Sequence, residues 1–273
     1  MIVSRRRRVR FGLIDTHCHL TFPEFRDRVD DVVIEAARHA VTGLVTISTT
    51  VPDAEGACRI AARHERVWFS AGVHPLNSDR GPHDWAALAR IARDPRCVAW
   101  GELGLDNHYD KPPRETQLPV LERHLACIEG SDRAGRVLPV VIHCREAYAD
   151  LIPILRASGI APERFVFHCF TGTPADMRMV LDFGAHVSFT GVVTYKNAPD
   201  VREAARMPPI DRVMVETDAP FISPEPVRSM RPCEPWMTSY TAVQLAALRG
   251  EHWDTFHKAI NDNTKRFFGI PAK

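Results

Sequence analysis

Short apolar runs rich in β-branched residues recur along the chain and predict eight strands. The runs cover residues 12–20, 43–49, 67–75, 97–106, 138–144, 164–172, 185–193 and 212–220. Most of the segments between them place apolar residues three or four positions apart, which is the spacing of a helix with one buried face. These predicted helices cover residues 28–41, 84–93, 114–135, 146–158, 173–184, 236–249 and 252–268.

The alternation of strands and helices predicts an α/β fold, a parallel (β/α)8 TIM barrel that forms a single domain over residues 12–273. A doubly wound open sheet is the alternative. It usually has fewer strands and a glycine fingerprint, and no G-x-G-x-x-G or G-x-x-x-x-G-K-[ST] motif occurs in this chain. Residues 1–11, which include Arg5–Arg8, are predicted to form a basic, solvated N-terminal extension.

Composition narrows the class of protein. Lys and Arg number 35 against 34 Asp and Glu, and the net charge of +1 argues against a protein that coats nucleic acid. The hydrophobic fraction of 45% excludes a disordered chain. The seven cysteines form no C-x-x-C pair, which predicts reduced thiols and a cytoplasmic location. No apolar run is long enough to span a membrane, so no membrane partner is expected, and no pattern predicts a protein partner.

Polar residues able to bind metal or phosphate lie at the ends of most predicted strands. Because the C-terminal ends of barrel strands meet at one rim, residues far apart in sequence should converge there. These residues are His17, His19, His74, Glu102, Asp106, His143, His168 and Asp218.

Each of these residue types suits a metal centre. His17 and His19 are two positions apart, so both imidazoles can point to the same side of a strand. The two oxygens of Glu102 can bridge two cations. Asp218 can bind a cation and can accept a proton from an attacking water. Glu216 is predicted either to support a metal-binding histidine or to form a buried ion pair.

The number of candidate ligands favours two cations. Four histidines and two carboxylates exceed the three protein ligands of a one-zinc catalytic site, so we expect two divalent ions per subunit. Their identity stays open among Mg, Mn and Zn. A serine nucleophile is disfavoured because no G-x-S-x-G motif occurs. Strand alternation predicts that Cys144 and Cys169 face away from the site.

Seven motifs together resemble those of the TatD-type metal-dependent hydrolases, a family of deoxyribonucleases. They are IDTHCHL (14–20), AGVHP (71–75), GELGLD (101–106), PVVIHCREA (139–147), FHCFTG (167–172), VETDAP (215–220) and NDNTKRFFG (261–269).

The resemblance implies a TIM barrel with a binuclear metal centre and assigns a role to each matching residue. It implies that the first ion is held by His17, His19 and Asp218, that the second is held by His143 and His168, and that Glu102 bridges both. It also implies that His74 and Arg145 either contact a substrate phosphate or lie behind the metal ligands. Many members carry R-G-K-R-N-E-P after the last strand. Residues 228–235 lack its Gly, Lys and Asn but keep Arg231 as a third candidate substrate contact.

These observations together predict a divalent-metal-dependent deoxyribonuclease, a 3′–5′ exonuclease-like phosphodiesterase acting on single-stranded DNA or on strand ends. Asp218 and Glu102 are its candidate catalytic residues. The alternative is an amidohydrolase or esterase acting on a small molecule or an aminoacyl-tRNA. Many such enzymes bridge their metals with a carboxylated lysine on the fourth strand, where this chain has Glu102 and no lysine. An inactive binding subunit is disfavoured because all six ligands are present.

Overall fold

The protein folds as a parallel (β/α)8 barrel, as the sequence predicts. The computed structural model describes residues 12–271, so the predicted extension over residues 1–11 lies outside the described residues. Eight strands pair in chain order from β1 to β8, and a bridge between Cys18 and Ala219 connects the two ends of the sheet. The strands are β1 Leu13–Cys18, β2 Val41–Thr46, β3 Val67–Ala71, β4 Cys97–Asp106, β5 Val140–Arg145, β6 Phe165–Phe167, β7 His186–Phe189 and β8 Val213–Val215.

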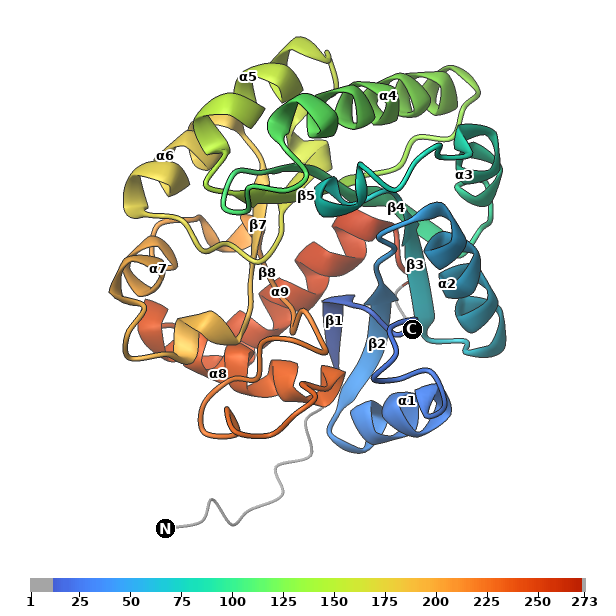
Figure 1. Cartoon of the computed structure of the whole chain (residues 1–273). Coiled ribbons are helices and arrows are strands. Elements are labelled where there is room, and N and C mark those ends of the chain that lie inside the picture. The colour runs from blue at the N-terminus through green and yellow to red at the C-terminus, as the bar shows by residue number, and fades with distance from the viewer. Residues whose placement is uncertain (1–11, 272–273) are drawn as a thin grey trace.

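Helices surround the barrel, as Figure 1 shows in a view along its axis. The α-helices are α1 Val29–Arg38, α2 Val51–Arg63, α3 Trp85–Ile91, α4 Arg114–Arg133, α5 Tyr148–Ala157, α6 Pro174–Phe183, α7 Pro199–Ala204, α8 Thr238–Arg249 and α9 Trp253–Phe268. Short 3-10 helices cover Pro75–Asn77, Pro162–Arg164, Gly191–Thr194, Ile210–Arg212 and Pro235–Met237. No helix within residues 12–271 has the length and apolar character needed to cross a bilayer.

Two of these helices were not predicted. Helix α2 buries Val51, Ala54, Ala57 and Ala61, which lie at helical spacing. Its start also carries a clear signal, because the side chain of Thr50 accepts a hydrogen bond from the backbone N–H of Asp53 and Pro52 lies in the first turn. Helix α7 has only six residues, too few to establish a helical period.

Several strands end earlier than the sequence suggested. Strand β3 ends at Ala71, β6 at Phe167 and β8 at Val215. His74, His168 and Asp218 therefore lie in loops just beyond the strands. The backbone leaves strand geometry sharply at two of these points, where Cys169 and Asp218 adopt φ values of 44° and 56°.

The apolar core has two parts that follow the alternation of side chains along the strands. The larger part lies between the barrel and its helices. The smaller part fills the N-terminal half of the barrel interior and contains Ile14, Val45, Val98, Val141 and Met214, with Phe268 from α9. The C-terminal half of the interior is lined by buried polar residues instead.

Candidate metal centre

The six predicted metal ligands converge at the C-terminal ends of the strands, around the carboxylate of Glu102. Its Oε1 atom lies 3.6 Å from His17 Nε2 and 3.7 Å from His19 Nε2. Asp218 Oδ1 completes this group, 3.2 Å from His19 Nε2 and 3.6 Å from His17 Nε2. On the opposite side of Glu102, Oε2 lies 2.7 Å from His168 Nε2 and 3.5 Å from His143 Nδ1. The two oxygens of one carboxylate thus face two separate groups of ligand atoms.

Pairing irregularities bring these side chains to the interior. The ladder between β1 and β2 shifts between Asp15 and Cys18. Ile14 points into the barrel, whereas Cys18 packs under the helices, so the strand changes facing between them. This change directs His17 and His19 inward. A similar shift in β4, between Trp100 and Leu103, flanks Glu102.

The first ligand group fits a cation. Separations of 3.2–3.7 Å between its donor atoms match ligands around one ion at bond lengths of about 2.0–2.2 Å. His19 Nδ1 lies 3.0 Å from the carbonyl oxygen of Ile47, which keeps a proton on Nδ1 and leaves Nε2 to face the ligand group. Nε2 lies 3.3 Å from His17 Nε2 and 3.2 Å from Asp218 Oδ1. Burial opposes a charge on His19, but the hydrogen bond with Asp218 outweighs it and raises the pKa of His19 to about 9, so a bound cation would take the place of the proton on Nε2.

The second group is oriented by two further carboxylates. His143 Nε2 lies 2.9 Å from Asp106 Oδ2, which assigns the proton to Nε2 and turns the Nδ1 lone pair toward Glu102. His168 Nδ1 lies 3.5 Å from Glu216 Oε1. A carboxylate behind a histidine is the usual support of a metal ligand, so this arrangement favours the first of the two predictions for Glu216. Glu216 is held in turn by the hydroxyl of Ser188, which donates to Oε2 at 2.6 Å.

His74 lies beside the second group, close enough to share a cation with Glu102 and His143. However, its Nδ1 accepts a hydrogen bond of 2.9 Å from the backbone N–H of Leu76. The proton of the neutral ring is therefore on Nε2, the atom that faces His143 Nδ1 at 3.0 Å. Burial and the neighbouring His143 lower the pKa of His74 to about 3, so the ring stays neutral. We interpret His74 as a hydrogen-bond donor to the site rather than a ligand.

The carboxylates of the site are held in their ionised form. Burial disfavours the charge of Glu102, but the histidines around it, with His168 Nε2 at 2.7 Å, outweigh burial and hold the pKa of Glu102 well below its usual range. Burial likewise opposes the charge of Asp218, whereas its contacts with His19 and His17 lower the pKa of that group overall. Ionised carboxylates and neutral imidazoles are the forms that bind divalent cations.

Backbone strain concentrates around the same residues. In the part of the chain that the structure describes, four non-glycine residues have clearly positive φ. Three of them, Glu146, Cys169 and Asp218, lie within three residues of the C-terminal ends of β5, β6 and β8. Such a conformation costs about 1–2 kcal/mol per residue, and it is typical of functional sites.

Of the two cysteines predicted to face away from the site, Cys144 packs between the barrel and its helices as predicted, whereas Cys169 lines the cavity. Cys169 does so because strand alternation has already ended at Phe167. Burial raises the pKa of both the Cys144 and Cys169 thiols well above the usual value, so they remain protonated. A cysteine nucleophile is therefore disfavoured on chemical grounds, although the predicted facing of Cys169 was wrong.

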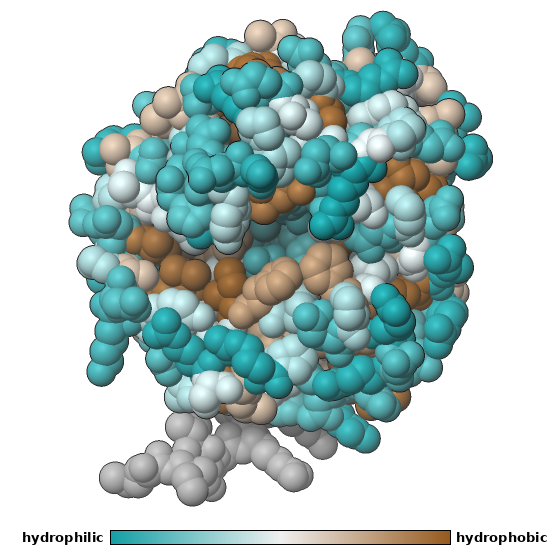
Figure 2. All heavy atoms as spheres, viewed as in Figure 1, coloured by the Kyte–Doolittle hydropathy of each residue, from teal (hydrophilic) through white to brown (hydrophobic). Residues whose placement is uncertain are grey.

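The cavity over this site has a volume of about 560 Å³, and Figure 2 shows the hollow in the face that the strand ends form. Arg145 lines it, with its guanidinium 5.1 Å over the ring of Tyr109. Arg231 is absent from the lining residues, and its Nη1 donates to the carbonyl of Met230 at 2.8 Å. Sequence reasoning did not single out the aromatic lining residues Phe22, Tyr109 and Phe221, because they belong to no predicted ligand pattern.

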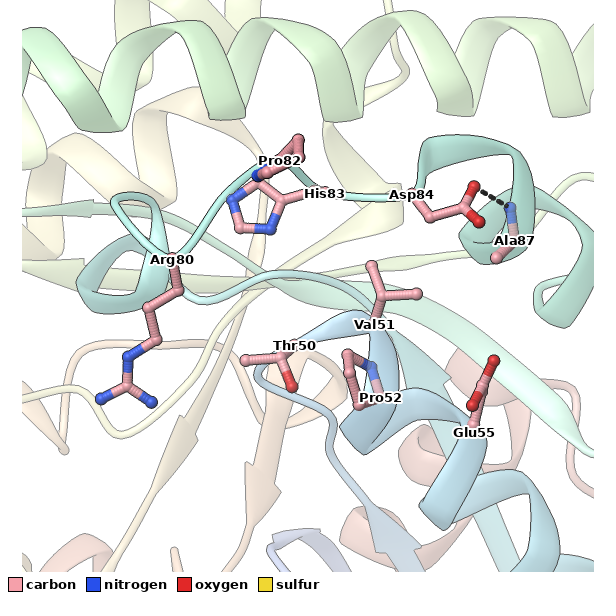
Figure 3. A pocket seen from close by; sticks show the side chains of 9 residues that line it. All are labelled: Thr50, Val51, Pro52, Glu55, Arg80, Pro82, His83, Asp84 and Ala87. Carbon is pink, nitrogen blue, oxygen red and sulfur yellow. Dashed lines mark hydrogen bonds between the residues drawn. The ribbon is translucent and has the colours of Figure 1, made fainter.

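A second cavity of about 430 Å³ lies between the start of α2 and the segment before α3 (Figure 3). It is lined by Arg80, His83 and Glu55 among others. Asp84 caps α3 by accepting a hydrogen bond from the N–H of Ala87. None of the candidate metal-binding groups within the described residues lies in this second cavity, so the first cavity is the candidate functional site.

The sequence and the fold both have clear relatives. Residues 14–269 match the family described as TatD related DNase. This protein belongs to the TatD related DNase family. The uncharacterised metal-dependent hydrolase YcfH of Escherichia coli is 36% identical over 265 residues, covering 95% of this chain and 97% of its own. The protein named 3′-5′ ssDNA/RNA exonuclease TatD of Erwinia amylovora is 31% identical, covering 94% of this chain and 100% of its own.

Among solved structures, the TatD homologue YjjV of Escherichia coli aligns with a TM-score of 0.87 at 27% identity. The alignment covers 95% of this chain and 98% of YjjV. The family assignment and the metal-dependent hydrolase class therefore agree with the chemistry of the converging ligands.

Proposed function

We propose that this protein is a metal-dependent phosphodiesterase that removes nucleotides from the 3′ end of single-stranded nucleic acid. The observation that carries the proposal is the carboxylate of Glu102, whose two oxygens face two groups of ligand atoms beneath one cavity. Two-metal hydrolases of phosphate esters require such a bridge. The name of the Erwinia amylovora relative supports the choice of substrate. The seven cysteines, all unpaired, fit a cytoplasmic location.

Two divalent ions, Mg, Mn or Zn, would be held as predicted. His17, His19 and Asp218 would bind one, His143 and His168 the other, and Glu102 both. When bound, such ions supply the positive charge that stabilises the transition state and the acidity that makes water a nucleophile at neutral pH.

The remaining steps belong to the side chains of this chain. Asp218 accepts the proton that the attacking water loses. The neutral Nε2–H of His74 donates a hydrogen bond to a non-bridging phosphate oxygen, and Arg145 balances the charge that develops there. The bond from phosphorus to the leaving sugar oxygen breaks, and that oxygen takes a proton from solvent. Asp106 keeps His143 oriented throughout, and Glu216 lies behind His168.

An amide or ester hydrolase is the second candidate. The observation that favours it is the apolar part of the cavity wall, where Leu76, Val192 and Ile222 lie beside the ligand groups. Such a wall suits an acyl substituent as well as a nucleobase.

The test is hydrolysis of 5′- and 3′-labelled single-stranded oligonucleotides with added Mg²⁺ or Mn²⁺, beside the Asp218→Asn variant. We expect the 5′-labelled strand to shorten stepwise while the 3′ label is released at once, and we expect the variant to lose this activity. No cleavage by protein shown to contain metal would contradict the proposal. Ester and amide substrates would then be tested with the same protein.

A further inference from the structure

The mouth of the metal site exposes aromatic rings in a way that the rest of the described surface does not. In residues 12–271, six large hydrophobic side chains are exposed, and only two of them are aromatic. These are Tyr109, 48% exposed, and Phe221, 51% exposed, and both line the cavity over the ligands. Scattered exposed aliphatic residues need no explanation, whereas two half-exposed rings in one cavity indicate a binding surface.

Phe221 is part of a small aromatic wall next to the first ligand group. Its ring lies 5.8 Å from that of Phe22 in an edge-to-face arrangement. Phe22 in turn stacks on the imidazole of His19, with ring centres 4.6 Å apart. Phe221 therefore packs on Phe22, which itself packs on a predicted metal ligand, while half of the surface of Phe221 stays exposed.

Tyr109 forms a second wall across the cavity. Phe22 and Phe221 follow β1 and β8, which are neighbours at the closure of the barrel, whereas Tyr109 follows β4. In a ring of eight strands β4 lies opposite that closure. Arg145 covers one face of the Tyr109 ring and also donates to its hydroxyl at 3.4 Å. The two walls therefore stand on opposite sides of the ligand groups.

The charge of the cavity is low for a nucleic-acid site. Arg145 is the only lysine or arginine among its lining residues. Proteins that bind duplex DNA neutralise several phosphates, typically six to ten in well-studied cases. A cavity with one cation and two aromatic walls instead suits an unpaired base, since every base offers a face for stacking.

We infer that Phe221, supported by Phe22, stacks on the base of the 3′-terminal nucleotide, and that this contact selects unpaired, base-bearing ends. Tyr109 and Arg145 bound the opposite side of the same nucleotide. The inference rests on the proposed function, because it places that nucleotide beside the phosphate to be cleaved. A paired terminal base could not enter between the walls until its pair had opened.

The experiment removes the ring and the base separately. Single-stranded oligonucleotides with a normal or an abasic 3′-terminal nucleotide are given to the wild-type protein and to Phe221→Ala. We expect loss of the base to lower kcat/KM of the wild-type protein by roughly 5- to 150-fold, the range typical of one stacked base. Phe221→Ala should lose a similar factor on the normal strand. On the abasic strand the two proteins should agree within about twofold.

Matched variants separate stacking from damage to the fold. Val243→Ala removes apolar surface from an exposed position on α8 and should leave kcat/KM unchanged. Phe221→Trp should restore the base-dependent part of kcat/KM. Thermal unfolding and metal content of Phe221→Ala are measured beside activity, because Phe221 N–H hydrogen-bonds to the carbonyl of Asp218. Unchanged values of both support the assignment.

Other results overturn the inference. If Phe221→Ala cleaves the normal strand as fast as the wild-type protein, Phe221 does not bind the base. The same conclusion follows if the substitution lowers kcat/KM by the same factor on the normal and abasic strands. In either case the proposed function stands, because the wild-type protein cleaves the strand. If the metal-replete wild-type protein cleaves neither strand, the proposed function fails and the inference fails with it.

Discussion

The two halves of the barrel interior are built from the same strands but have opposite composition. Strand β5 contributes Val141 to the lower, N-terminal half and His143 to the upper half. The lower half is packed with apolar side chains, among them Phe268 and Ile270 from the C-terminal segment. The upper half contains buried His17, Glu102 and Glu216. Val141 and His143 are two positions apart on the same strand, yet the first belongs to the apolar core and the second to the candidate metal site.

The difference has an energetic consequence. Burial of apolar surface in the lower half stabilises the fold by about 25 cal/mol per Å² removed from water. The upper half buries ionised carboxylates, whose desolvation opposes folding unless partners or cations compensate. We therefore expect substitutions in the upper half to affect catalysis more than stability. Substitutions in the lower half should affect stability more than catalysis. The following predictions test this division, starting with the largest expected effect.

Asp218→Asn should lower kcat by about 10²- to 10⁴-fold, because it removes the proton acceptor and one charged ligand. The free energy of unfolding of the metal-free protein should change little, because the relief of burying a charge is offset by the loss of its contacts with His19 and His17. Oligonucleotide hydrolysis and urea unfolding in chelator measure the two quantities. Asp200→Asn, at an exposed position on α7, is the matched control and should change neither. A strongly destabilised Asp218→Asn protein would contradict the division.

Phe268→Ala should lower the free energy of unfolding by about 3–5 kcal/mol, because Phe268 is 4% exposed and closes the lower half. Activity per folded molecule should not change. Urea unfolding with metal present measures the loss. Phe267→Ala removes the same ring from the partly exposed neighbouring position and should cost less. A fall in kcat of folded Phe268→Ala would show that the lower half also positions the ligands.

The sequence predicted the fold and the ligand set more readily than the details that orient the ligands. Strand-end positions of His17, Glu102 and His143 follow from alternation and from the motifs, because both describe residues local in the chain. The tautomer of His74 could not be predicted, since it depends on the backbone N–H of Leu76 in a turn. Helix α2 was missed although its buried alanines are spaced as on one helix face and Thr50 caps its start.

Long-range contacts account for most of the other differences. The hydrogen bond between Asp106 and His143 joins the ends of two strands, and no spacing in either segment indicates which nitrogen it fixes. The facing of Cys169 was predicted from an alternation that ends at Phe167. Arg231 was assigned by motif position alone, whereas the structure turns its guanidinium to backbone carbonyls of its own loop. Its role in substrate binding stays a prediction.

His124 on α4 should make stability depend on pH. Its Nε2 accepts a hydrogen bond of 3.0 Å from the N–H of Val73, next to His74. Burial lowers the pKa of His124 to about 4, below the value near 6.5 expected in the unfolded chain. Below pH 6.5 the unfolded state therefore binds the proton first. The free energy of unfolding should fall between pH 6.5 and 4, by up to about 3 kcal/mol.

Urea unfolding of the wild-type protein and of His124→Gln at several pH values isolates this contribution. The difference between the two proteins should change across pH 6.5 to 4 and should be constant above pH 7. A constant difference at all pH values would show that His124 does not titrate in this window.

Asp106→Asn should weaken metal binding by only one of the two ligand groups, the one that contains His143. It therefore tests whether the two groups in the upper half of the barrel bind metal independently. The asparagine keeps an oxygen to accept hydrogen bonds from the N–H groups of His108 and Tyr109, so the loop should hold. The new amide N–H would face the Nε2–H of His143, which favours moving the ring proton to Nδ1, the atom that faces Glu102. That change competes with a cation bound there, and metal affinity of this group should fall about 10- to 100-fold.

Native mass spectrometry during metal titration should find one ion retained at concentrations that fill both groups in the wild-type protein. Asp110→Asn, in the same loop but exposed, should bind metal normally. Loss of both ions together from Asp106→Asn would mean that Glu102 couples the two groups into a single binding unit.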